Sequence, residues 1–309
     1  MLFSSNSLGL EINSKGAAFA LISGKPASTK LERVSFRPFP SGLLRISLRE
    51  TNVTDPDVFV RTLREAHGLL LHQGTRLSVT LPDGVGRIML LDVEGRFRNR
   101  TEALDIIRWK IKKNIPFDVA DAHLDYQQLM IRETGELSLL VALASREIIM
   151  RYEELITAAG LVPARIEFNA FSLCRAFERS LESMQNGLLT GFYDNSLIIL
   201  IFNEGVPEFA RFKELPGTSP VDRRVYTEIN NSLLAYRERF PEREIKQAAC
   251  FSPPDVAADF LSMVSDAADC AASPLETRTV VTPSDSVPTD QASIFPYTAA
   301  IGAALGSLW

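Results

Sequence analysis

One stretch of the sequence, residues 101–118, most constrains the fold because it predicts a helix with a defined end. Leu104, Ile107 and Ile111 recur at helical spacing and form one apolar stripe. Pro116 predicts the end of the helix, since the residue before a proline is pushed towards extended geometry. The residues that follow alternate as in a β-strand, so this stretch indicates a mixed α/β fold.

Two apolar residues, Ile106 and Trp109, fall away from that stripe. We therefore expect the helix to be packed between two layers. A large aromatic residue outside the core stripe is either a contact for a partner or a residue buried between subdomains. The sequence leaves both interpretations open for Trp109.

The composition is that of an ordinary globular chain and limits the class of partner. The 309 residues are 46% hydrophobic and 23% charged, and they are numerous enough to form two lobes. The formal net charge of −5 argues against nucleic acid as a partner. The three cysteines are odd in number and lack metal-ligand spacing, so they predict free thiols in a reducing cytosol and no metal site.

Membrane-spanning and secretion signals are not evident in the sequence. No apolar run approaches the ~20 residues that a membrane-spanning helix needs. The first residues, MLFSSNSLGLEI, lack the charged and apolar regions of a signal peptide. We therefore expect a cytoplasmic protein without direct membrane insertion, which reaches a membrane only through a partner.

The order of motifs over residues 77–178 resembles a known family. After the helix ending in IPF come a strand with LDYQ, a strand ending in VALAS, a helix RYEELITAAGL and the segment EFNAFSLCRAFE. This series is similar to PilM, the actin-like cytoplasmic protein of type IV pilus assembly. It is more distantly similar to the cytoplasmic part of GspL-type secretion proteins. The ordered series carries the resemblance, because no single motif in it is diagnostic.

The resemblance implies an α/β, actin-like fold with two lobes of the duplicated ribonuclease H-like type. The first lobe is expected over residues 1–185 and includes a small inserted α+β subdomain at about 87–143. The second lobe is expected over residues 186–309. It is expected to be truncated, because the few residues of 216–220 stand where relatives carry a further subdomain.

By resemblance, the first turn of the chain is a phosphate loop, where relatives carry Asp-x-Gly. The corresponding residues here are Glu11, Asn13, Ser14 and Lys15. Glutamate can still hold a metal and asparagine tolerates positive φ, so the loop is weakened and not abolished. A plain polar hairpin turn is the favoured interpretation, and a working phosphate loop is the alternative.

The other nucleotide elements of relatives are lost from this sequence. Gly191 stands where the second loop carries its metal-linked Asp, and Tyr193 stands where its glycine belongs. Pro253 and Pro254 follow the strand that in relatives carries a Gly-Gly pair at the adenosine site. With the missing subdomain, three of four elements are gone. The resemblance and these departures predict no cofactor, no metal and no catalytic residue, with Mg·ATP as the alternative cofactor.

The resemblance implies a non-catalytic adaptor of a type IV pilus or related secretion machine. PilM binds the short N-terminal tail of the inner-membrane protein PilN in a groove between its first subdomain and the inserted one. A PilN-like tail is therefore the expected partner, which recruits the protein to the inner membrane, and Ile106, Trp109 and Phe117 are candidate groove residues.

Two alternatives to this adaptor role are an ATP-binding PilM-type protein whose nucleotide state controls partner binding, and a sugar-kinase-like phosphotransferase. Self-association and the choice between a pilus and a type II secretion setting stay open.

Overall fold

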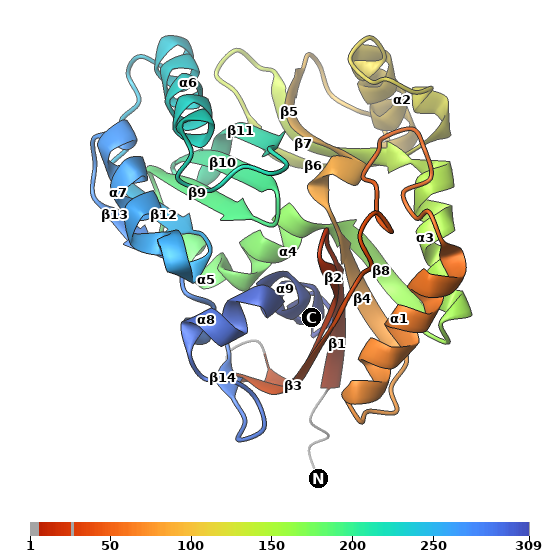
Figure 1. Cartoon of the computed structure of the whole chain (residues 1–309). Helices are drawn as coiled ribbons and strands as arrows, with labels where there is room; N and C mark the ends of the chain where they lie inside the picture. Colours follow the sequence, from red (N-terminus) through yellow and green to blue (C-terminus); the bar gives the residue numbers. More distant parts are fainter. Residues whose placement is uncertain (1–5, 26–27, 309) are drawn as a thin grey trace.

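Three β-sheets with helices around them form the part of the chain that the structure, a computed structural model, describes: residues 6–25 and 28–308 (Figure 1). The two larger sheets repeat one plan. In each, three consecutive strands form an antiparallel meander. The first strand of the meander pairs in parallel with a later strand, which pairs in parallel with another. This repetition is what a duplicated two-lobed architecture requires.

The first lobe is built on the six-stranded sheet, of order β14-β3-β2-β1-β4-β8. Its strands are β1 (Asn6–Ile12), β2 (Gly16–Lys25), β3 (Ser28–Pro38), β4 (Arg76–Leu81), β8 (Val162–Phe168) and β14 (Thr282–Pro283). The helices around it are α1 (Pro56–Leu69), α3 (Arg146–Ala158), α4 (Asn169–Ala176) and α9 (Thr298–Leu305). Helices α1 and α3 cover one face of this sheet, and α4 and α9 cover the other (Figure 1).

The second lobe is built on the five-stranded sheet, of order β11-β10-β9-β12-β13. Its strands are β9 (Gly187–Tyr193), β10 (Ser196–Asn203), β11 (Val206–Glu214), β12 (Gln247–Phe251) and β13 (Ala272–Pro274). The helices of this half of the chain are α5 (Glu178–Glu182), α6 (Arg223–Arg239), α7 (Ala257–Ala268) and α8 (Gln291–Ile294). Helices α6 and α7 pack on its outer face, where the second apolar core lies.

The end of the chain returns to the first sheet. Strand β14 pairs with β3, and α9 lies between β1 and α4. Gly9 of β1 faces the carbonyl of Ala300, and Gly302 faces the carbonyl of Ser172 in α4. A Cβ at either glycine would lie well under 3.0 Å from that backbone. The predicted second lobe, residues 186–309, therefore contains a final segment that packs with the first lobe.

The inserted subdomain is a three-stranded sheet, β5-β7-β6, with one helix. Its elements are β5 (Gly86–Val93), α2 (Arg100–Ile111), β6 (Ala122–Ile131) and β7 (Leu137–Ser145). Helix α2 covers one face of the sheet, where Ile107 and Ile111 pack with Leu139 and Val141. These residues bury the apolar stripe that the sequence predicts.

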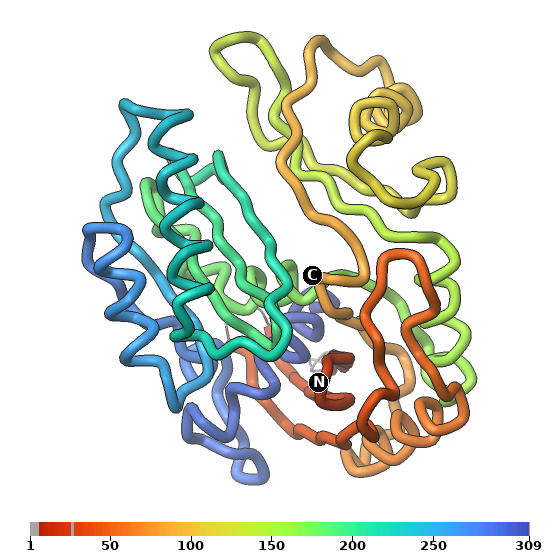
Figure 2. The backbone as a smooth tube through the Cα atoms, turned by 45° about the horizontal axis from the view of Figure 1, so that its top comes forward, coloured from red at the N-terminus to blue at the C-terminus, as the bar shows by residue number. Residues whose placement is uncertain are grey.

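The expectation that this helix is packed between two layers is wrong. Ile106 is half-buried against the sheet, but Trp109 is 79% exposed. The three-stranded sheet supplies one layer, and α2 lies at the outer edge of the molecule, with no second layer over it in the described chain (Figure 2). Trp109 is therefore a surface residue and is not buried between subdomains.

The inserted subdomain also contacts the second lobe. Asp92 of β5 pairs with Arg132 at 2.7 Å and with Arg239 of α6 at 2.6 Å. The two guanidinium groups lie over the ring of Phe240, at 5.7 and 5.1 Å from its centroid. This bridge fixes the insert against α6.

Candidate partner groove and interlobe turns

The turn between β1 and β2 lies against the turn between β9 and β10. The backbone N–H of Ser14 donates to Oδ2 of Asp194 at 3.0 Å, and the Ser14 hydroxyl donates to the other carboxylate oxygen. The hydroxyl of Tyr193 donates to Oε2 of Glu11 at 2.9 Å. Ser14 and Glu11 are therefore hydrogen-bonded directly to Asp194 and Tyr193 of the second lobe.

Glu11 is fully buried at this contact. Burial raises the pKa of its carboxyl to about 8, although hydrogen bonds from Asn13 and Tyr193 act to lower it. The Asn13 amide donates to Oε1 of Glu11 at 2.9 Å, and its own Oδ1 accepts from the backbone N–H of Lys15 at 2.9 Å. The structure thus places Glu11 near the end of β1 and Asn13, Ser14 and Lys15 in the turn that follows. The Glu11 and Asn13 side chains bond to groups of the protein itself.

Aromatic rings occupy the space beside these turns. The ring of Phe251 covers Gly191 so closely that any side chain at Gly191 would overlap it. Phe251 in turn stacks on Phe177, with ring centroids 5.5 Å apart, and Tyr193 packs on Phe295 at 5.4 Å. A metal-binding Asp at position 191 would require these rings to move.

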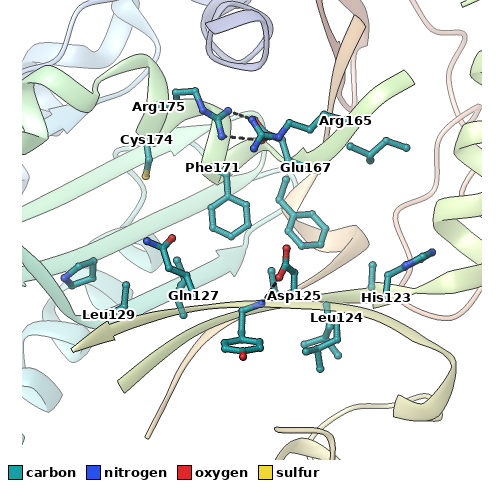
Figure 3. A pocket seen from close by; sticks show the side chains of 18 of the residues that line it. His123, Leu124, Asp125, Gln127, Leu129, Arg165, Glu167, Phe171, Cys174 and Arg175 are labelled. Atoms are coloured by element: carbon teal, nitrogen blue, oxygen red, sulfur yellow. Dashed lines mark hydrogen bonds and ion pairs between the residues drawn. The ribbon is translucent and has the colours of Figure 1, made fainter. Parts of the chain in front are cut away.

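A second region, which we call the β6–β8 groove, lies between the insert and the two lobes (Figure 3). Its volume is about 1140 Å³. Strand β6 forms one wall, β8 and α4 form the opposite wall, and the turn between β10 and β11 adds a third side. In the described chain, β6 and β8 each lie at the edge of a sheet, so each presents backbone N–H and C=O groups without a strand partner.

The groove combines an apolar interior with polar side chains on β6. Leu140 and Ala142 of β7 line it from the insert, opposite the rings of Phe168 and Phe171, whose centroids are 6.2 Å apart. Gln127 of β6 projects towards α4, as Figure 3 shows. Such a lining fits an extended chain that carries apolar residues.

A charged network holds the wall of β8 and α4 in place. Glu167 is largely buried and accepts hydrogen bonds from Arg175 at 3.0 Å and from Ser172 at 2.5 Å. Arg165 lies 3.6 Å from the same carboxylate and donates to the carbonyl of Gly306 at 3.0 Å. Because the buried carboxylate is paired and hydrogen-bonded, this network is structural.

Comparison with solved structures, and not with sequences, identifies proteins similar to this chain. No family model matches the sequence, and the search of curated proteins found no match. Among solved structures, the PilM–PilN type IV pilus biogenesis complex matches with a TM-score of 0.82 at 18% identity, over 98% of this chain and 98% of that one. The fold is PilM-like.

Two further solved structures share the architecture of this PilM-like chain more distantly. The cytoplasmic domain of EpsL, an inner-membrane component of the Vibrio cholerae type II secretion system, matches with a TM-score of 0.51 at 11% identity over 94% of each chain. A Bacteroides thetaiotaomicron protein of unknown function with an actin-like ATPase fold matches with a TM-score of 0.52 at 10% identity, over 87% of this chain and 90% of that chain. The predicted α/β, actin-like class and the PilM resemblance are confirmed.

The three candidate groove residues do not come together in this PilM-like fold. Ile106 and Trp109 belong to α2, which covers the face of the insert sheet opposite the β6–β8 groove. Phe117 lines a separate pocket of about 940 Å³, beside Met150 of α3. Ile106 and Trp109 are separated from the groove because side chains of β7 alternate between the two faces of the sheet. Leu139 and Val141 pack with α2, and Leu140 and Ala142 line the groove.

Sequence reasoning missed the residues that line the groove. Leu129 of β6 and Phe171 of α4 are 42 positions apart in the sequence, and only tertiary packing brings their elements together. One signal was available. Strand β6 alternates without a fully buried face beyond Ala122, which is typical of a strand that lies at a sheet edge.

Among the described residues, no helix is both long and apolar enough to cross a membrane. In the same residues, no group of three or more His, Cys, Asp or Glu side chains is arranged to hold a metal ion.

Proposed function

We propose that this chain is a non-catalytic adaptor of a type IV pilus or related secretion machine. It binds the short cytoplasmic N-terminal tail of an inner-membrane PilN-like protein in the β6–β8 groove. It works in the cytoplasm and is recruited to the inner membrane by that partner. The proposal rests on the groove, which is bordered by two sheet edges without a strand partner. The class of partner is supported by the similar solved structure, which is a complex of PilM with PilN.

The tail binds as an added strand. Its backbone pairs with the free edge of β6 or β8, which supplies hydrogen bonds that do not depend on sequence. Alternate side chains then enter the groove between Leu140 and the rings of Phe168 and Phe171, where apolar residues are favoured. Backbone pairing and burial of apolar side chains both contribute to affinity, and the apolar positions supply the selectivity.

Leu129→Asp tests the groove, because it places a carboxylate against the apolar part of the incoming tail. We expect this change to weaken binding of a synthetic PilN-like tail peptide at least about tenfold, since burying one leucine contributes about 1.5–3 kcal/mol. Isothermal titration calorimetry on the full chain measures the effect.

The matched control for this test is Ile131→Asp, on the same strand. Ile131 is 55% exposed and does not line the groove, so its change should leave the affinity unaltered. Equal effects of the two substitutions, or no effect of Leu129→Asp, would place the tail elsewhere and overturn the groove assignment.

Millimolar Mg·ATP should leave the melting temperature of this protein unchanged. The reason is that Ser14 and Glu11, which would have to contact the phosphate or its metal ion, are hydrogen-bonded to Asp194 and Tyr193 instead. A ligand present at about 100 times its Kd adds about 2.7 kcal/mol to folding, which raises the melting temperature of a chain this size by a few degrees. A rise that disappears in Glu11→Ala would instead make the ATP-binding alternative the leading one.

A further inference from the structure

One segment of the insert, residues 94–118, carries a charge of opposite sign to the rest of the chain. Residues 94–118 contain seven Lys or Arg and four Asp or Glu, which gives this segment a net charge of +3. The whole chain has a net charge of −5, so the remaining residues together carry −8. A local positive region on an acidic protein attracts an anionic partner to one place on its surface.

This positive segment lies at an extremity of the molecule. Helix α2 stands at the outer edge of the fold in both views (Figures 1 and 2). Trp109 projects from it with 79% of its surface exposed, more than any other large apolar side chain in the described chain. Lys112 and Lys113 follow three and four positions later, on the same outward side.

Exposed basic side chains on either side of α2 in the sequence are available to a partner. Arg96 and Arg98 precede the helix, and Lys112 and Lys113 follow it. Within residues 6–25 and 28–308, none of these four forms an ion pair. Three of the four acids in residues 94–118 are engaged. Asp105 pairs with Arg108 at 3.4 Å, Glu102 accepts the backbone N–H of Arg98 at 2.6 Å, and Asp118 accepts a backbone N–H at 3.0 Å.

We propose that this surface, the α2 outer face (Arg96, Arg98, Trp109, Lys112 and Lys113), binds the anionic surface of a lipid bilayer. Tryptophan side chains are enriched at the membrane–water interface, where the ring lies at the level of the lipid headgroups. Lysine ammonium groups beside it can interact with the lipid phosphates. Binding is peripheral, and no part of the chain crosses the bilayer.

The shape of the surface favours a bilayer over an acidic protein segment. Trp109, Lys112 and Lys113 line neither the β6–β8 groove nor the pocket at Phe117. They stand on a protruding helix, which meets a flat charged surface without needing a cavity. Because α2 and the groove lie on opposite faces of the insert sheet, this contact is independent of the proposed tail binding and leaves the groove open.

Flotation of the full chain with lipid vesicles tests the proposal in the absence of any protein partner. We expect binding to vesicles of phosphatidylglycerol and phosphatidylcholine in equal parts, no binding to phosphatidylcholine alone, and loss of binding at high salt. Lys112→Ala with Lys113→Ala should weaken binding about 30-fold, which corresponds to about 1 kcal/mol for each lysine.

The matched control is Lys30→Ala with Lys246→Ala, which removes the same charge from exposed sites outside the insert. This control should bind vesicles nearly as well as the unchanged protein. An equal loss in the two double variants would show that only the net charge matters and would overturn the assignment to the α2 outer face.

The position of Trp109 gives a second readout. The chain has two tryptophans, so the measurement uses a Trp309→Phe background. Trp109 emission should shift to the blue on anionic vesicles and be quenched by brominated lipid. The absence of a shift in Trp109 emission would overturn the membrane proposal. Binding to soluble polyglutamate without binding to vesicles would also overturn it, and would assign the surface to an acidic protein. Neither result affects tail binding in the groove, which is measured separately.

Discussion

Gly302→Ala is expected to destabilise the protein by about 3 kcal/mol or more, which makes it among the most damaging single-methyl changes in the chain. A Cβ at this position would overlap the carbonyl of Ser172. That carbonyl belongs to the backbone of α4, so no side chain can rotate away to make room. The added methyl group can be accepted only if α9 moves away from α4, and α9 is also packed on β1.

Urea denaturation followed by circular dichroism measures this effect. Gly68→Ala is the control, because nothing lies within 4 Å of a Cβ at Gly68 and the residue is in a helix. Alanine there should stabilise the protein by about 0.5–1 kcal/mol. A Gly302→Ala protein as stable as the unchanged one would mean that α9 is not held between β1 and α4 in solution.

The second large effect concerns pH. The free energy of unfolding should fall as the pH rises from about 5 to about 8. Burial raises the pKa of Glu11 from its ordinary value of 4.5 to about 8, and burial likewise raises that of Asp83 from 3.8 to about 7. In this interval the folded state holds protons that the unfolded state has already released, so stability present at low pH is lost as the pH climbs. One unit of pKa difference corresponds to about 1.4 kcal/mol, so Glu11 alone contributes on the order of 4 kcal/mol across the interval.

Chemical denaturation at a series of pH values tests this prediction. Glu11→Gln should flatten the decline, because an amide at this position stays neutral and keeps a partner for Tyr193. Glu153→Gln, at an exposed site on α3, should keep the full decline. Stability that instead increases with pH over this range would mean that Glu11 is ionised in the folded protein.

Local sequence patterns predicted much of the fold. The apolar stripe of Ile107 and Ile111 does bury one side of α2, as helical periodicity requires. The series of helix and strand motifs after it indicated the PilM-like fold that the solved structures confirm. These features depend on residues close together in the sequence. There the spacing of apolar residues distinguishes a helix from a strand and shows which side is buried.

Contacts between distant segments could not be predicted in the same way. Periodicity places Trp109 outside the core stripe, but it does not reveal whether another layer covers that side. Ser14 and Asp194 are 180 positions apart, and no local pattern in either turn specifies their hydrogen bonds. The groove likewise depends on how β6 lies relative to α4, which is decided by packing of whole elements.

The contacts between the two lobes include Ser14 with Asp194 at the turns and Asp92 of the insert with Arg239 of α6. A rotation of one lobe relative to the other would have to break at least one of these contacts. For the adaptor role that we propose, this means that binding of the partner depends on the concentrations of the two proteins and not on a change of shape within this chain.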